Sequence, residues 1–468
     1  MFNKLVKMCG ESFDIVSREI TIGHEKVAYV YSETLSSSDS VTDFLLKPIS
    51  NILLLNNGNE RSNFEELIKN SITGASCKKV NNLDDAVKEI FNGHTVLVID
   101  DSYMLAIETK ATLDRGITEA EVENSIAGPK DAFGENLNKN VGLIRKRIRN
   151  HNLIVKTLFL GNESNTKIAI SYMDNIADKS LVNKVLERTK KIKNDIIIDG
   201  GYVTEEFSRV SFLPEVNQTE RPDLASFALL EGKVCLLVDN SPTVLIIPTF
   251  FIDFFHTADD YYQKNINTTF IRILRFIAFF IAIFLPGYYI SITTYNPTSI
   301  PTALLMKLIS QHTSVPFPAF FEILIMIIAF EILRESDIRI PNKVGSSTSI
   351  LGGLILGDAA VSAGIISPIM IIVVAISSIS SLIFPYNSMI NLIRYYRYFI
   401  LVLAILFGLY GIFIGFALLI INISSITSFG YPYTYPFVPF IKNDIKDSLI
   451  KADGKKLRNP LISKKINR

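Results

Sequence analysis

Short apolar runs alternate with polar stretches along residues 1–260, at lengths typical of strands and helices. The two clearest runs are GHTVLVIDDSYMLAI from Gly93 and GKVCLLVDNSPTVLI from Gly232. Each predicts a strand that ends in aspartate, a turn that contains serine, and a returning strand. Because such strands alternate with helical stretches, the region is predicted to be α/β, with one subdomain over residues 1–127 and a second over residues 151–260.

The two predicted subdomains can be aligned with each other. Lys26-VAYVY matches Lys167-IAISY, 141 residues later, and the run from Gly93 matches the run from Gly232, 139 residues later. This nearly constant offset indicates an internal duplication. The alternative is chance similarity, since unrelated α/β units share strands of this kind.

A helical pattern occupies residues 128–150, between the subdomains. Gly-Pro at its start ends any preceding helix, and apolar residues then recur at helical spacing, at Leu137, Val141, Ile144 and Ile148. The spacing predicts an amphipathic linker helix over Glu135–Arg149 with a basic face, formed by Arg145, Lys146, Arg147 and Arg149. These cations either suit the C-terminal end of a solvated helix or form a docking surface for a partner or for lipid phosphates.

Long hydrophobic segments dominate the second half of the chain, and we expect an α-helical, multi-spanning membrane domain over residues 270–425. The second segment is short and contains Glu322 and Glu331, which is typical of a partial or protein-buried insertion; Glu331 also has the spacing to pair with Arg334. The segments are Ile273–Thr293, Pro316–Leu333, Thr348–Ile366, Ser367–Phe384 and Tyr398–Ile421.

Cations cluster before the first segment (Arg272 and Arg275), after the second, before the fifth (Arg394 and Arg397) and in a basic C-terminal tail, residues 426–468. The positive-inside rule puts all four clusters in the cytoplasm, whereas five simple crossings from a cytoplasmic N-terminus leave the tail outside. We therefore expect a cytoplasmic tail, four crossings and re-entrant material. The alternatives are that the SFGYPYTYPFVPF stretch dips back into the membrane, or that the tail breaks the rule.

Small residues and one carboxylate mark the third segment as the candidate pore or gating element. Gly353 and Gly357 form a GxxxG pair, which lets helix backbones approach each other, and Ser362 belongs to the same small-residue segment. Asp358 is costly at membrane depth unless it faces water or a partner. The alternative is a structural, hydrogen-bonded carboxyl near an interface.

Charge is segregated along the chain. Only 11 of the 93 charged side chains fall between Phe276 and Ile441, which explains a mean hydropathy of +0.30 in a chain with 20% charged residues. With a net charge of +1, nucleic acid is not an expected partner. The first residues lack an apolar signal segment, so the N-terminal region is predicted to stay in the cytoplasm.

The pattern contains no motif for catalysis or metal binding. Cys9, Cys77 and Cys235 lack CxxC spacing and are expected to be buried free thiols, while the five histidines stand apart from one another and from acidic partners. Asp100 and Asp101 follow a strand without a glycine-rich phosphate loop, and a turn-capping role is favoured. We therefore expect no enzyme activity, no metal and no cofactor.

Five motifs, in order, strongly resemble the A subunits of spore germinant receptors, the GerA family. They are GPKDAFGENLNKNVGLIRKRI, NSPTVLIIPTFFIDFFHTADDYY, PFPAFFEILIMIIAFEILRESDIRIP, ILGGLILGDAAVSAGIISPIMIIVVAISSISSLIFP and SFGYPYTYPFVPF. Matching positions in the linker helix are Gly128, Pro129, Asn136, Arg145 and Arg147. Matching positions in the membrane half include Glu322, Glu331, Arg334 and Arg339. Ile327 and Asp358 depart from the family's pattern.

The resemblance implies a non-enzymatic subunit of a nutrient-responsive receptor in the inner membrane of a bacterial spore. It also implies that A subunits form a homo-oligomeric, ion-conducting channel in contact with membrane lipid, beside a transporter-like B subunit and a lipoprotein C subunit. The alternatives are a secondary transporter, for which no inverted repeat is visible, and a membrane scaffold or signalling subunit without conduction.

Overall fold

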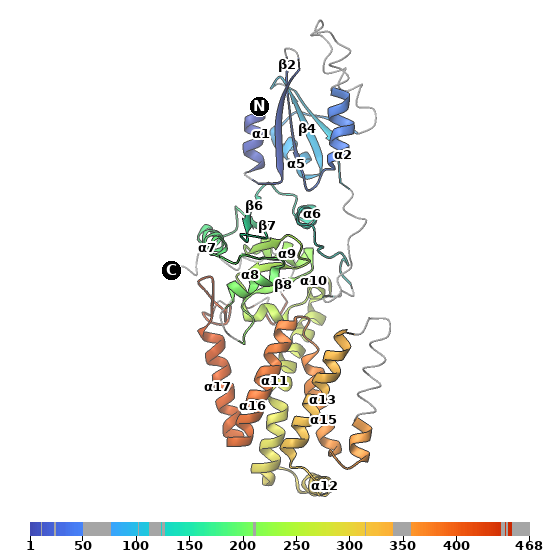
Figure 1. Cartoon of the computed structure of the whole chain (residues 1–468), viewed down its shortest axis with the longest axis vertical. Coiled ribbons are helices and arrows are strands. Elements are labelled where there is room, and N and C mark those ends of the chain that lie inside the picture. Colours follow the sequence, from blue (N-terminus) through green and yellow to red (C-terminus); the bar gives the residue numbers. More distant parts are fainter. Residues whose placement is uncertain are drawn as a thin grey trace.

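The structure is a computed structural model that describes residues 1–49 except 11, 23 and 24, residues 76–111 except 102, residue 123, and residues 127–208. It further describes residues 212–339 except 314, residues 357–440, residue 445 and residues 448–451; for residues 22, 25 and 337–339 only the backbone is described. Two β-sheet subdomains and a helical bundle follow one another along the long axis (Figure 1). The predicted architecture, an α/β region followed by an α-helical region, is confirmed.

The first subdomain is a five-stranded antiparallel sheet of order β1-β2-β4-β5-β3, covered on both faces. Alternate side chains of a strand point to opposite faces, so Val30 and Val96 pack under α1 and α5, whereas Tyr29 and Leu97 pack under α2. The elements are α1 Phe2–Cys9, β1 Ile15–Ile22, β2 Glu25–Ser32, α2 Ser38–Val41, a π-helical turn Thr42–Leu46, β3 Cys77–Val80, α5 Leu83–Phe91, β4 His94–Ile99 and β5 Tyr103–Glu108.

The second subdomain has a sheet of the same kind, of order β6-β7-β9-β10-β8. The helices α6 and α9 pack on one face of this sheet, and α7 and α8 pack on the other. The elements are α6 Leu137–Arg147, β6 Leu153–Leu160, β7 Thr166–Met173, α7 Lys179–Lys190, α8 Gly200–Phe207, β8 Asn217–Thr219, α9 Pro222–Leu230, β9 Val234–Val238 and β10 Val244–Ile247. The predicted linker helix is therefore part of the second subdomain.

The aligned sequences occupy equivalent places in the two sheets. The backbone N–H of Asp100 donates to the carbonyl of Lys26 at 2.9 Å, and the N–H of Asp239 donates to the carbonyl of Lys167 at 3.0 Å. The Asp100 carboxylate also accepts from the N–H of Lys26 on the neighbouring strand β2 at 3.0 Å. The shared strand order and these equivalent contacts support the internal duplication.

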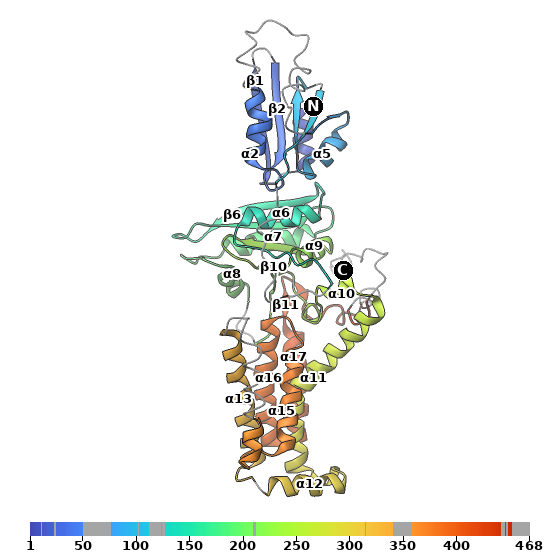
Figure 2. The same ribbon diagram turned by 90° about the vertical axis from the view of Figure 1, so that its right-hand side faces the viewer.

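The helical half begins at α11 and forms a bundle below the second sheet, with α12 lying across the far end (Figures 1 and 2). Among the described residues, α11 and α16 are long and apolar enough to cross a membrane, and α15 and α17 are shorter apolar helices. The elements are η2 Phe251–Phe255, α10 Asp259–Tyr262, α11 Asn265–Tyr295, η3 Pro297–Ser299, α12 Thr302–His312, α13 Ala319–Arg339, α15 Pro368–Ser381, α16 Asn387–Phe407, α17 Leu409–Ser425, β11 Thr427–Ser428 and β12 Tyr431–Pro432.

The fifth hydrophobic segment, predicted as one stretch over Tyr398–Ile421, is two helices. Gly408 ends α16 with a φ of 60°, a left-handed conformation that glycine adopts without steric cost, and α17 packs back along α16. Arg394 and Arg397 consequently lie within α16 and not before it. Hydropathy alone missed this reversal because both helices are apolar on either side of the turn.

The chain after α17 returns to the second subdomain. The Tyr431 hydroxyl donates to Asp178, the Tyr433 hydroxyl donates to the carbonyl of Pro214, and the Thr249 N–H donates to the Ser428 hydroxyl. The aromatic SFGYPYTYPFVPF stretch therefore packs on protein at the sheet end of the bundle.

Candidate functional site

Arg145, on the last turn of α6, connects the two subdomains. Its guanidinium is fully buried and binds both carboxylate oxygens of Asp14, with Nε to Oδ2 and Nη2 to Oδ1 each at 3.0 Å. The plane of the group lies over the Phe91 ring. Because this cation is enclosed by protein, it is not available to lipid phosphates, and its place in the fold is the junction between subdomains.

The environment of Asp14 favours the ionised pair. Burial tends to raise the pKa of its carboxyl, but Arg145 and the hydroxyls of Ser12 and Ser32 outweigh burial and hold the pKa below its usual value. The neighbouring cation Arg147 instead binds Asp131 with its side chain one-fifth exposed. Two cations of the predicted basic face are thus paired within the protein: Arg145 is in a buried ion pair and Arg147 is in a half-buried one.

The other linker residues position α6 and the chain before it. The Asn136 side chain caps α6 by accepting from the N–H of Lys139. The carbonyl of Pro129, next to Gly128, accepts from Nη2 of Arg221 at 2.8 Å. Arg221 also pairs with Asp223, whose carboxylate accepts from the Tyr262 hydroxyl at 2.6 Å. This buried cluster connects the start of the linker, the second subdomain and α10.

A second buried carboxylate holds the start of α11 against the segment that precedes it. Asp260 accepts from Nε of Arg272 at 3.2 Å and from Nη1 of Arg275 at 2.8 Å. Arg275 also donates to the carbonyl of Phe255 and to the Thr257 hydroxyl. Both arginines are buried, so these boundary cations anchor α11 to the second subdomain in addition to any interaction with lipid headgroups.

Arg397 lies buried inside the helical bundle, bound to backbone carbonyls. Pro286 lacks an N–H, so within α11 the carbonyl of Ala282 loses its usual partner four residues on. That carbonyl accepts instead from Nε of Arg397 at 3.0 Å and from the Ser377 hydroxyl at 2.9 Å, while Nη2 of Arg397 reaches the carbonyl of Ser377 at 3.4 Å. One unpaired carbonyl therefore connects α11, α15 and α16.

Glycines allow these helices to pack closely. A Cβ at Gly411 would lie 2.0 Å from the carbonyl oxygen of Leu403, and a Cβ at Gly415 would lie 2.8 Å from the Ile400 side chain. Gly287 in α11 faces the same turn of α16. Gly411 and Gly415 form a GxxxG pair. This pair was not predicted from the sequence; the pair predicted there is Gly353 and Gly357.

The second hydrophobic segment carries two buried or half-buried carboxylates. Glu331 lies 3.8 Å from Nη1 of Arg334, as its spacing predicted, and only 2.8 Å from Nη2 of Arg394 on α16. The side chain of Arg339, at the end of α13, lies outside the described residues. Glu331 thus pairs with a cation on a neighbouring helix of the bundle, α16.

Glu322 is fully buried and binds a histidine. Its Oε1 lies 3.1 Å from Nδ1 of His312, and its Oε2 accepts from the N–H of Ser367 at 2.9 Å. Nε2 of His312 lies 3.1 Å from the Tyr289 hydroxyl. The expectation that the histidines stand apart from acidic partners is therefore wrong at His312, and also at His94, whose Nδ1 lies 3.1 Å from Oε2 of Glu89. The ten-residue spacing crosses a helix break, and periodicity on one helix cannot detect such a pair.

The candidate pore segment is described in part. Gly353 lies outside the described residues, and Gly357 makes an ordinary packing contact, since a Cβ there would lie 3.9 Å from Ile371. Asp358 and Ser362 are both exposed in helical conformation. Residues four apart share a helix face, so the carboxylate and the hydroxyl lie on one exposed face.

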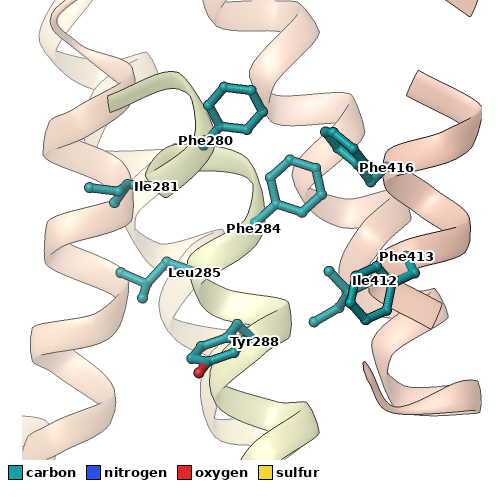
Figure 3. A pocket seen from close by; sticks show the side chains of 8 residues that line it. All are labelled: Phe280, Ile281, Phe284, Leu285, Tyr288, Ile412, Phe413 and Phe416. Atoms are coloured by element: carbon teal, nitrogen blue, oxygen red, sulfur yellow. The ribbon is translucent and has the colours of Figure 1, made fainter. Parts of the chain in front are cut away.

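An apolar groove of about 410 Å³ lies between α11 and α17 (Figure 3). It is lined by Phe280, Ile281, Phe284, Leu285, Tyr288, Ile412, Phe413 and Phe416. The Tyr288 hydroxyl is the single polar side-chain group among these residues, so the groove suits apolar contacts and not a polar solute.

Comparison with known proteins identifies the relatives of this chain. The family described as "Bacillus/Clostridium GerA spore germination protein" matches residues 3–460. The chain belongs to the GerA family. It is 35% identical to "Spore germination protein KA" of Bacillus subtilis over 95% of this chain and 82% of that protein. It is 33% identical to "Spore germination protein GerQA" of Bacillus cereus over 99% of this chain and 92% of that protein.

Two further GerA relatives bear on location and structure. "Uncharacterized membrane protein YfkQ" of Bacillus subtilis is 34% identical over 94% of this chain and 86% of its own length. The solved N-terminal domain of the A subunit of the Bacillus megaterium germinant receptor GerK3 covers 53% of this chain and 93% of its own, with 27% identity and a TM-score of 0.43. The predicted family is confirmed by the family match over residues 3–460.

Proposed function

We propose that this GerA family protein is the A subunit of a nutrient-responsive germinant receptor, and that several copies form an ion-conducting channel in the inner spore membrane. It acts there with a transporter-like B subunit and a lipoprotein C subunit, and its sheet subdomains lie in the cytoplasm. Family membership supports the germination role. The conduction role is a property proposed for the helical bundle.

The exposed face of Asp358 and Ser362 carries the conduction proposal. A carboxylate on the surface of an apolar bundle is unfavourable against lipid, and it becomes favourable when it faces water or a neighbouring subunit. The small residues Ala359 and Ala363 on the adjacent surface are also exposed, and they allow another helix to approach. A ring of such faces in an oligomer places one acidic side chain per subunit along a shared, cation-attracting path.

Ion flux through the purified full chain in liposomes tests this proposal. Asp358→Asn keeps the side-chain shape and removes the charge, so it should reduce the preference for cations over anions while the protein stays folded. Asp84→Asn, an equally conservative change at an exposed carboxylate on α5, is the matched control and should leave flux unchanged. Wild-type protein that reconstitutes without ion flux, or Asp358→Asn with unchanged selectivity, would overturn the conduction role.

A further inference from the structure

A histidine, a tyrosine and a glutamate meet at the end of the bundle remote from the sheets. Tyr289 comes from α11, His312 ends α12, and Glu322 lies in the first turn of α13. The second oxygen of Glu322 binds the N–H of Ser367, the residue that caps α15. Four helices, α11, α12, α13 and α15, therefore meet at one imidazole and its carboxylate.

The imidazole is reachable from outside, although the carboxylate is not. The His312 side chain is 24% exposed, whereas that of Glu322 is fully buried. His312 forms part of the wall of a cavity of about 400 Å³, which is also lined by residues at the end of α11, along α12 and at the start of α13. Water in this cavity can thus exchange protons with the ring without entering the packed core.

The ring can keep both contacts in either protonation state. As an imidazolium, His312 donates from Nδ1 to Glu322 and from Nε2 to the Tyr289 oxygen. As a neutral ring protonated on Nδ1, it still donates to Glu322, and Nε2 accepts from the Tyr289 hydroxyl, which rotates. The geometry survives deprotonation, but the charge balance does not, because Glu322 then remains as a buried anion without a cation.

We propose that Tyr289, His312 and Glu322 form a proton-binding site that fastens the short helix α12 to the far end of the bundle. With the proton bound, the ion pair is neutral overall and α12 is held in place. When the proton leaves, the uncompensated Glu322 favours separation from its apolar surroundings, and α12 loosens.

The surrounding charges are few. Tyr289 faces the ring from α11 and Glu322 faces it from α13, while α15 contributes the neutral N–H of Ser367. On α12 itself, Lys307 is exposed to the outside. In the described part of the chain, the ion pair with Glu322 is thus the contact that sets the response.

Cysteine accessibility in the full chain tests this site directly. Leu308 is the buried position of α12, so a cysteine at Leu308→Cys should react with maleimide only when α12 separates from the bundle. Ser310 is exposed on the same helix, so labelling of Ser310→Cys measures how thiol reactivity itself changes with pH. Cys77 is replaced by serine. Burial raises the pKa of Cys9 and of Cys235 to about 12, so both stay protonated and unreactive in the folded protein.

The ratio of maleimide labelling at Leu308→Cys to that at Ser310→Cys should rise by about tenfold or more between pH 5.5 and pH 8, as linkage to one proton allows over this range. In a His312→Gln background, which keeps hydrogen-bonding groups but does not titrate, the ratio should be flat with pH. A flat ratio in the wild-type background, or an equal rise with His312→Gln, would overturn the proposal. The readout requires no ion conduction, so its failure would leave the proposed channel untouched.

Discussion

The carbonyl of Ala282 offers a sharp test of how the bundle is held together. Pro286 removes its helical donor, and Ser377 and Arg397 supply replacements at 2.9 and 3.0 Å. We therefore predict that Ser377→Ala and Arg397→Met are each tolerated alone but strongly destabilising together. Adding Pro286→Ala should rescue the double variant, because residue 286 then donates an N–H to the carbonyl four residues back.

The expected magnitudes follow from counting donors to this one oxygen. Either single substitution leaves one donor in place, and an interhelical hydrogen bond in a membrane contributes about 0.6 kcal/mol on average. Arg397→Met also removes a buried charge, and an apolar residue of similar length offsets part of its loss. The double variant leaves a buried carbonyl unpaired, which costs a further amount of about 1–3 kcal/mol. The coupling energy between Ser377→Ala and Arg397→Met should therefore be about 1–3 kcal/mol when residue 286 is proline. It should be near zero in the Pro286→Ala background.

Fluorescence gives an assay that is specific for the bundle. The chain contains no tryptophan, so Tyr288→Trp, at a half-exposed position two residues from Pro286, provides a single tryptophan in α11. Unfolding in mixed micelles with increasing denaturing detergent would then yield free energies for each variant, all measured in this same background. Additive effects of Ser377→Ala and Arg397→Met, within about 0.3 kcal/mol, would refute the shared-carbonyl argument. So would a coupling energy that Pro286→Ala does not change.

Three further predictions concern the soluble region and the tail. Arg145→Gln should lower the unfolding free energy by about 3–5 kcal/mol in denaturant titrations. Arg147→Gln should cost less, because its pair with Asp131 is only half-buried; equal effects would contradict this. The pKa of Asp14 is lowered in the fold, so the contribution of its ionised carboxylate to the unfolding free energy should be complete above about pH 4 and lost as the pH falls through the lowered pKa. Asp14→Asn should abolish this acid dependence. Reporters fused before Met1 and after Arg468 should both be cytoplasmic, and an external tail would contradict this.

The prediction about the tail draws on a contact that hydropathy could not supply. The carbonyl of Ser448 lies 2.7 Å from Nε2 of His256, and the N–H of Lys451 donates to the Thr269 hydroxyl at the start of α11. The described residues of the tail therefore lie at the sheet end of the bundle. The expected cytoplasmic tail requires the tail and the sheets to lie on one side, and the chain makes one of its reversals at Gly408.

The local features of the fold were predictable because they depend on short-range physics. Strand alternation and the apolar positions of α6 predicted elements that the structure contains, and all four of those positions, Leu137, Val141, Ile144 and Ile148, are buried. The Glu331–Arg334 pair likewise follows from helical spacing alone.

The long-range contacts were not predictable from one sequence. Asp14 and Arg145 are 131 residues apart, and Ala282 and Arg397 are 115 apart, so neither pair leaves a periodic signal. Arg145 was interpreted as part of an exposed basic face because composition reports charge but not enclosure. Of the contacts that were missed, Gly411 and Gly415 alone carried a usable pattern, the GxxxG spacing.

Buried polar contacts lie at three successive junctions between the first sheet and the helical bundle. Arg145 connects the sheets, Asp260 connects the second subdomain to α11, and the carbonyl of Ala282 connects α11 to α15 and α16. Each contact is enclosed by protein, so displacement of one unit leaves a charge or carbonyl unpaired unless the next unit moves as well.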